Sequence, residues 1–197
     1  MRKLVVDEWL TLDGVAQAPG EPKEDTTGGF AYGGWHMNFV DDDFMQWMLN
    51  NLHEAGGFVL GRRTYEGFAS RWPNATAEEQ PVADPLNSSP KYVATRTLSD
   101  PLEWENSTVL KGELHNTVSA LKGKPGGDLH VIGSTQLVHS LLDRDLVDEL
   151  RVIIDPVVVG GGKRLFSQDG RLRSFRLLDS SVTSKGSIIA TYGVERG

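Results

Sequence analysis

Residues 129–142, LHVIGSTQLVHSLL, change from a strand pattern to a helix pattern within one short turn. The first residues form an apolar, β-prone run, and the last ones place apolar side chains at helical spacing. Between them lie Gly133, Ser134, Thr135 and Gln136. A strand that leads directly into a helix is the unit from which parallel sheets are built. This stretch therefore limits the chain to an α/β architecture.

The same alternation of strand and helix runs through the middle of the chain. The pattern predicts strands at 3–14, 57–61, 91–98, 107–110, 129–132 and 148–160, helices at 41–57, 62–72, 113–124 and from 135, and a hairpin at 175–195. Pro156 predicts a kink or bulge in its strand. The Gly-rich and Pro-rich segments 15–40 and 73–90 are expected to be long connections. We predict one α/β domain over 1–197, with a mixed, mostly parallel central sheet flanked by helices and an antiparallel C-terminal hairpin.

Composition excludes several classes of protein. The net charge of −7 argues against a general nucleic-acid binder, which needs a broad cationic face. The chain has no cysteine, and its five histidines have no metal-ligand spacing, so we expect no metal site. No apolar run approaches the roughly 20 residues that cross a membrane. Asp7 and Glu8 interrupt the first apolar segment, which therefore does not read as a signal peptide. We expect a cytoplasmic protein that binds a small molecule.

Three predicted strands end in short polar turns, Gly61–Thr64, Thr95–Arg96 and Gly133–Gln136. Ligands of open α/β sheets bind outside the carboxyl ends of the strands, and helix N-termini at this edge offer free amides to phosphate. Two of the turns add arginine. The three turns together predict a phosphorylated ligand, although Ser134 and Thr135 could equally serve as helix caps and the arginines could be solvated. The G-x-G-x-x-G fingerprint is absent, which excludes the common Rossmann solution.

These segments carry a resemblance to a known family. FVLGRRTYEGF resembles the GR-x-T segment of the dihydrofolate reductase fold, and KYVATRTL is similar to its next strand. LHVIGSTQLVHSLLDRDLVDELRVIIDPVVVGGGKRLF is similar to the reductase domain of the bifunctional deaminase-reductase of bacterial riboflavin biosynthesis, in its stand-alone form. That enzyme's zinc deaminase needs cysteine ligands, which this chain lacks.

The resemblance implies NADPH as the cofactor and assigns residues to it. It places the adenosine phosphate at Gly61, Arg62, Thr64, Thr95 and Arg96. It places the diphosphate and nicotinamide at Gly133, Ser134, Thr135, Gln136 and Leu137. Glycine at position 133 would let the backbone approach the diphosphate.

Two acids are candidates for proton transfer. The TLDG segment with Asp13 resembles the SLDG that borders the nicotinamide and substrate in riboflavin-type reductases, but it also suits a simple Asp-Gly turn. Asp43 lies near the place of the acid on the first helix of dihydrofolate reductases, but it also suits the N-terminus of a helix. His36 could reach a substrate. The glycine-rich segment before Lys163 could bind an anion or act as a hinge.

The resemblance thus implies an NADPH-dependent oxidoreductase that transfers hydride to a small heterocyclic substrate, of the pteridine or ribosylaminopyrimidine type. The alternative is a non-catalytic NADP(H)- or nucleotide-binding protein of the same fold. Relatives of this kind are often dimers, so a homodimer is expected, with the proline-bearing strand as one candidate for its interface.

Overall fold

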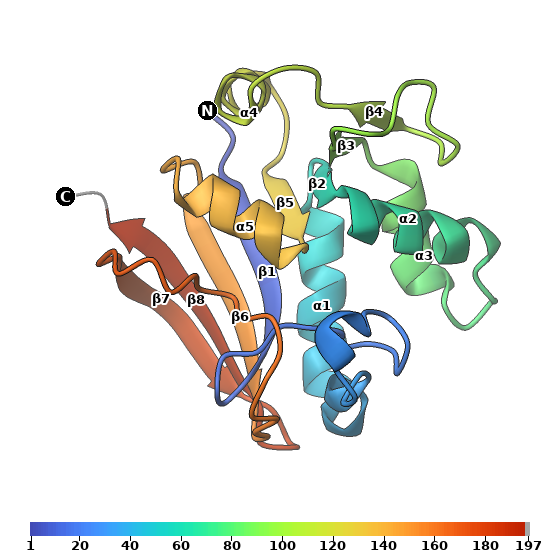
Figure 1. The fold of residues 1–197 in the computed structure, drawn as a ribbon. Helices are drawn as coiled ribbons and strands as arrows, with labels where there is room; N and C mark the ends of the chain where they lie inside the picture. Colours follow the sequence, from blue (N-terminus) through green and yellow to red (C-terminus); the bar gives the residue numbers. More distant parts are fainter. Residues whose placement is uncertain (196–197) are drawn as a thin grey trace.

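The computed structural model describes residues 1–195, and these form an eight-stranded sheet of order β4-β3-β2-β5-β1-β6-β8-β7 (Figure 1). The strands are β1 (Leu4–Thr11), β2 (Phe58–Gly61), β3 (Lys91–Ala94), β4 (Ser107–Val109), β5 (Leu129–Ile132), β6 (Glu149–Asp155), β7 (Ser174–Val182) and β8 (Ile188–Glu195). Strands β1 to β6 pair in parallel, whereas β8 is antiparallel to both β6 and β7. The mixed, mostly parallel sheet with an antiparallel C-terminal hairpin is confirmed.

Helices cover both faces of the sheet. They are α1 (Asp42–Glu54), α2 (Arg62–Arg71), α3 (Gln80–Ser88), α4 (Leu114–Lys122) and α5 (Thr135–Leu142). Because side chains alternate between faces along a strand, Val59 joins the apolar cluster of α4 and α5, whereas Phe58 and Leu60 join the cluster of α1, α2 and α3. Helices α1 and α5 therefore pack on opposite faces.

Strands β1 and β5 separate at their carboxyl ends. Their last paired residues are Asp7 and Ile132, whereas β1 continues beside β6 as far as the pair Thr11 and Asp155. The chain leaves β1 toward α1 on one face and leaves β5 toward α5 on the other. Connections that diverge in this way open a crevice, which is where α/β sheets bind ligands.

The segment 73–90 differs from the sequence-based expectation of a long connection, since it contains α3. Pro81 lies in the first turn of this helix, where a missing N–H costs nothing. Ala83 and Leu86 are buried against the neighbouring helices. The buried Lys91 ammonium donates hydrogen bonds to the carbonyls of Leu86, Asn87 and Ser89 at 2.8, 3.0 and 3.0 Å. Tertiary packing and this C-terminal cap stabilise a helix in a segment whose prolines predicted an irregular connection.

Two smaller expectations are also corrected. Segment 15–40 is not wholly irregular, because it contains the short 3₁₀ helices η1 (Thr27–Gly29) and η2 (Trp35–Phe39), and a third, η3 (Trp72–Asn74), follows α2. Pro156 comes directly after β6 and so does not interrupt the strand. Both edges of β6 are paired within the chain, by β1 and β8, so that no second copy can add to this strand by edge pairing. The homodimer itself stays a prediction.

Within the described residues, no helix is both long and apolar enough to cross a membrane.

Candidate functional site

The β2–α2 and β5–α5 turns touch each other at the carboxyl edge of the sheet. A methyl group built on Gly61 would lie 2.6 Å from Ser134 Oγ, and one built on Gly133 would lie 3.2 Å from Thr64 Oγ1. Gly133 has a φ of +63°, in the region that favours glycine, and the Gly133–Ser134 peptide is cis. The structure thus brings together these four residues, which the sequence had placed in one cofactor site.

The helices that begin at these turns have free N-termini. Gly61 precedes α2 without any side chain, and Ser134 precedes α5 without a capping hydrogen bond to any described residue. The contrast is α1, where Asp41 Oδ1 accepts the Phe44 N–H at 2.9 Å. Ser134 thus occupies the N-cap position of α5 without the side-chain hydrogen bond that a capping serine makes. The first amides of α2 and α5 remain available to an anion, which the two helix dipoles also attract.

The side chains after Ser134 divide between the surface and the core. Gln136 is exposed, whereas Thr135 and Leu137 are buried, and Leu137 packs in the cluster under α5. Leu137 can therefore contribute its backbone amide to a bound phosphate, but not its side chain.

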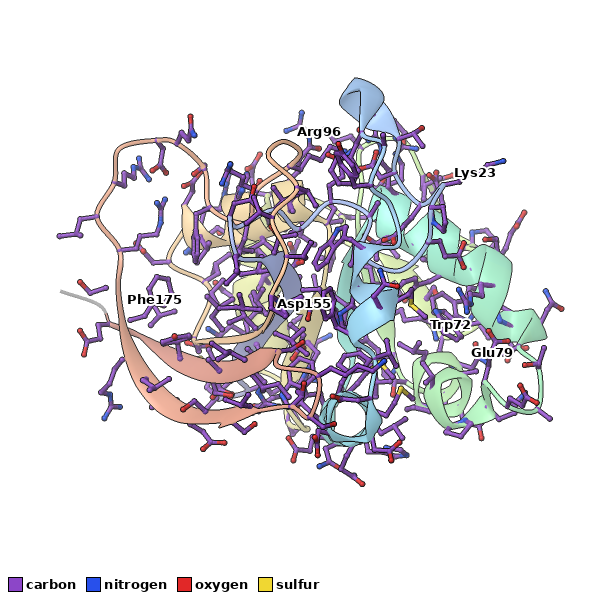
Figure 2. The ribbon with its side chains drawn as sticks, turned by 90° about the horizontal axis from the view of Figure 1, so that it is seen from below. Lys23, Trp72, Glu79, Arg96, Asp155 and Phe175 are labelled. Carbon is purple, nitrogen blue, oxygen red and sulfur yellow. The ribbon has the colours of Figure 1, made fainter. Side chains whose placement is uncertain are left out.

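Arginines stand beside the paired turns. Arg62 Nη1 lies 3.0 Å from each Glu66 carboxylate oxygen, in a half-exposed pair along α2. Arg96 is exposed, forms no ion pair among the described residues, and lies at the rim of the molecule in Figure 2, which looks onto the carboxyl edge. Thr95 Oγ1 accepts the N–H groups of Thr97 and Leu98 at 3.1 Å each, which fixes the turn that carries Arg96. A solvated guanidinium of this kind is free to pair with a phosphate.

Glu8 is a buried carboxyl at the point where β1 and β5 separate. It follows Asp7, the last β1 residue paired with β5, and the Gly133 N–H lies near enough to its carboxyl to lower its pKa slightly. Its side chain is buried, and Oε1 has no hydrogen-bond partner among the described residues. Burial raises the pKa of Glu8 to about 8, and the negative charges of Asp7 and Glu24 add to the effect. A carboxyl that burial disposes to be neutral near pH 7 therefore borders the β5–α5 turn.

Sequence reasoning missed Glu8 as a site residue, although a signal was present. Asp7 and Glu8 stand inside a strongly apolar strand, where carboxylates are rarely tolerated without a partner. These two acids were interpreted only as evidence against a signal peptide. Buried acids with shifted pKa values are enriched at functional sites.

The loop after β1 places Glu24 near Glu8. Glu24 Oε2 accepts the N–H groups of Gly20 and Glu21 at 2.8 and 3.2 Å, and burial raises its pKa. The same loop is held to the end of α2 by an ion pair between Glu21 and Arg71. The loop thus closes over the end of the crevice.

A second buried network lies on the α1 side of the crevice. His36 Nδ1 is 2.7 Å from Asp155 Oδ2, and the Ser187 hydroxyl donates to Asp155 Oδ1 at 2.7 Å. His36 Nε2 has no partner among the described residues and is ringed by Trp9 and Phe44 at 6.2 and 4.5 Å between ring centroids. Asp155 lies near the middle of the carboxyl edge in Figure 2. An imidazole can both donate and accept a proton, which makes His36 a candidate proton carrier on that side.

Asp13 occupies a structural position after β1. Its carboxylate accepts the Thr11 hydroxyl at 2.6 Å and the Gly160 N–H at 2.9 Å, and the Thr11 bond is the main cause that lowers the pKa of Asp13. Arg164 Nη2 also lies 3.9 Å from Asp13 Oδ2. These contacts fasten the loop to the glycine-rich segment and stabilise the carboxylate, which is unfavourable for a proton donor.

Asp43 lies in the first turn of α1 and is exposed. Its Oδ2 accepts the Ser184 N–H of the β7–β8 turn at 2.8 Å, and Asp41 binds the same turn through the Lys185 N–H at 2.9 Å. Both acids thus attach the hairpin to the helix. A catalytic role for Asp13 or Asp43 stays a prediction.

An open cleft of about 550 Å³ lies between two segments. One is the loop after β1, which contributes Gln17 and Thr27–Tyr32, and the other is the glycine-rich segment Val159–Lys163. The Lys163 N–H donates to Gln17 Oε1 at 2.9 Å, and the Lys163 side chain pairs with Asp25. The Gly160 amide binds Asp13. Because these groups already hold the loop, the contacts are unfavourable for an anion site, and the hinge interpretation of this segment stays a prediction. No group of acids, histidines or cysteines among the described residues could hold a metal ion.

The fold matches solved structures. Dihydrofolate reductase from Enterococcus faecalis, complexed with NADP(H), superposes with a TM-score of 0.62 at 15% identity, covering 98% of this chain and 97% of that chain. A putative riboflavin biosynthesis protein from Shewanella sp. PV-4 superposes with a TM-score of 0.71 at 24% identity, covering 98% and 99%. The fold is that of the dihydrofolate-reductase-like proteins.

The sequence comparison narrows this class. Residues 2–189 match the family model of the RibD C-terminal domain, and the chain belongs to this family. The uncharacterized protein YyaP of Bacillus subtilis strain 168 is 24% identical to this chain in an alignment 197 residues long. The alignment covers 97% of this chain and 94% of YyaP. The resemblance drawn from the sequence is confirmed.

The contact between the two turns can be tested by Gly61→Ala. We expect this change to lower the free energy of unfolding by about 0.5–1.5 kcal/mol, because Ser134 Oγ must rotate away from the new methyl group. Ser134→Gly in the same chain removes the clashing atoms and should restore most of the loss. Urea denaturation measures both effects.

The matched control is Gly67→Ala, in the same helix, where an added methyl group meets nothing within 4 Å. It should be neutral or stabilising, since alanine favours helices. Equal effects of the two substitutions would contradict the close contact.

The buried acid makes stability depend on pH. The folded-state pKa of Glu8, about 8, lies above the usual value of 4.5, so the folded protein binds more protons between these limits. The stability associated with the neutral acid is therefore present below about pH 4.5 and lost as pH rises toward 8. Glu8→Gln should raise the free energy of unfolding at pH 8 by on the order of a few kcal/mol, and much less at pH 5. The control is Glu103→Gln, because Glu103 is exposed. It should leave the free energy of unfolding unchanged at pH 5 and at pH 8, as measured by urea denaturation.

Proposed function

We propose that this protein is an NADPH-dependent reductase that acts on a small heterocyclic substrate. The observation that supports it most is the contact between the turns at Gly61 and Ser134, where the free N-termini of two helices meet at the carboxyl edge. Glycine at positions 61 and 133 leaves a cradle that side chains would fill. Two converging sets of amides suit a dinucleotide diphosphate, which carries negative charge along its length.

The proposed roles follow the placement of the residues. Gly61, Arg62, Thr64, Thr95 and Arg96 bind the adenosine phosphate side. Gly133, Ser134, Thr135, Gln136 and the Leu137 amide bind the diphosphate and nicotinamide side. NADPH is preferred over NADH because the arginines can pair with a 2′-phosphate. When bound, the reduced nicotinamide supplies hydride, while the protein orients it and excludes water.

The substrate is proposed to lie on the α1 side of the crevice, next to the rings of Trp9 and Phe44 and the buried imidazole of His36. Flat rings pack favourably against such side chains. A pteridine or a ribosylaminopyrimidine has the required shape. Because Asp13 and Asp43 are engaged in hydrogen bonds that hold the loop and the hairpin, the proposal does not depend on either acid.

Cofactor preference is tested by tryptophan fluorescence titrations with NADPH and NADH. Arg62→Ala and Arg96→Ala should each weaken NADPH binding by about tenfold or more, because a charge-assisted bond to the 2′-phosphate is lost, and should leave NADH binding nearly unchanged. Glu66→Gln frees Arg62 from its partner and should keep or strengthen NADPH binding.

Arg144→Ala is the matched control, since Arg144 lies beyond the other end of α5 and its side chain bonds only to the Ser140 carbonyl among the described residues. It should alter neither affinity. Equal losses for both cofactors in the Arg62 and Arg96 variants would contradict the 2′-phosphate assignment.

Catalysis is tested by following the loss of NADPH absorbance with pteridines, ribosylaminopyrimidines, quinones and aldehydes. Turnover of a flat heterocycle is the expected result. NADPH binding without turnover of any compound would favour the alternative, a non-catalytic NADP(H)-binding protein, for which the engagement of Asp13 and Asp43 in structural contacts is the supporting observation.

A further inference from the structure

The position of Glu8 has consequences beyond those of a buried acid in general. It is the first β1 residue beyond the pairing with β5, its side chain is buried, and the nearby Gly133 N–H slightly favours its ionised form. Gly133 opens the turn that we assign to the nicotinamide side of the cofactor. Since Val6 and Leu10 of β1 pack in the α5 cluster, the alternation of side chains places Glu8 on the face of α5. This acid therefore lies beside the backbone of the turn that we assign to the cofactor.

No described cation neutralises Glu8. The charged groups that act on it are Asp7, its neighbour on β1, and Glu24, from the loop that closes the crevice, and both are acidic. The negative charge of Asp7 is itself directed toward His130, whose Nδ1 lies 2.7 Å from Asp7 Oδ2. The α5 side offers apolar residues and the Gly133 amide. One carboxyl oxygen, Oε1, is buried and left without a partner.

The protonation state of a carboxyl in this environment depends strongly on any charge placed beside it. With a pKa of about 8 it is mostly neutral at pH 7, because burial and two like charges disfavour the ionised form. A positive charge at the crevice would reverse that balance, since opposite charges attract strongly where water is excluded. A neutral ring in the same place would leave the acid protonated.

We propose that Glu8 is the charge partner of the nicotinamide ring, protonated when the reduced cofactor is bound and ionised when the oxidised cofactor is bound. This inference rests on the proposed reductase function. The oxidised nicotinamide ring carries one positive charge more than the reduced ring, so Glu8 would be ionised beside the oxidised ring and neutral beside the reduced one, and the ring and Glu8 together would carry no net charge in either state. Because Glu8 lies on the α5 face and the substrate is proposed on the α1 side, Glu8 releases its proton to solvent and recovers one from solvent when NADP⁺ leaves. The substrate gains one hydrogen as hydride from the cofactor and the other as a proton from solvent.

The test measures proton release when NADP⁺ or NADPH binds. Isothermal titration calorimetry at pH 7 in two buffers of different ionisation enthalpy gives the number of protons exchanged. NADP⁺ should release up to one proton more than NADPH. Both cofactors carry the same 2′-phosphate, so the protons that this group exchanges on binding cancel when the two values are subtracted. The difference therefore reports on the nicotinamide ring. Glu8→Gln, which keeps an acceptor for the Gly133 N–H, should abolish the difference.

Affinities give a second readout that does not depend on turnover. The affinity for NADP⁺ relative to NADPH should rise by about tenfold per pH unit at most as pH increases toward 8, and then level off, because ionised Glu8 favours the cationic ring. In Glu8→Gln this ratio should not vary with pH.

Glu24→Gln is the matched control, since it removes the neighbouring acid but leaves Glu8 in place. Loss of the Glu24 charge lowers the pKa of Glu8, so the proton release should persist with its midpoint at lower pH. If Glu24→Gln abolished the difference and Glu8→Gln did not, the assignment to Glu8 would be overturned. Equal proton release with both cofactors in the wild-type protein would also overturn it, while leaving the reductase function intact. Failure of the wild-type protein to bind either cofactor would instead contradict the proposed function itself.

Discussion

The separation of β1 from β5 is the constraint on which the rest of the site depends. Strand β1 continues beside β6 after its pairing with β5 has ended, and the chain leaves the two strands toward opposite faces. This geometry turns the Gly133 amide toward Glu8 and brings Ser134 against Gly61. The free helix N-termini, the buried acid and the loop over the crevice all surround this one opening in the sheet. A ligand that enters there meets groups from several elements at once.

Two buried polar atoms beside the crevice, Glu8 Oε1 and His36 Nε2, have no hydrogen-bond partner among the described residues. Each costs stability, because a desolvated polar group loses its interactions with water. Such groups are expected where a protein binds or reacts, since binding supplies the missing partners. The uncapped N-termini of α2 and α5 are not unusual in themselves, because α3 and α4 also lack side-chain caps from the described residues. What distinguishes α2 and α5 is that the turns before them meet at one edge of the sheet.

Local pattern was sufficient to predict most of the sheet and the turns. Runs such as 129–142 contain a complete strand, turn and helix, so that no distant residue is needed to recognise them. Helix α3 was missed because its prolines argue against a helix locally, while its stability comes from buried contacts and from Lys91, which follows it in β3. Glu8 was missed for a related reason. Its burial depends on a loop folding over the crevice, and its charge environment depends on Glu24, which no local pattern brings near it.

The loop between β1 and α1 connects the two halves of the site. Asp13 fixes its beginning to the glycine-rich segment, Gln17 accepts the Lys163 N–H, and the Glu21 carboxylate pairs with Arg71 on α2. The loop therefore lines the open cleft on one side and places the Glu24 charge near Glu8 on the other. Any movement of the loop that reshapes the cleft also moves a negative charge relative to the buried acid. The electrostatics of the crevice and the shape of the cleft are thus set by the same segment.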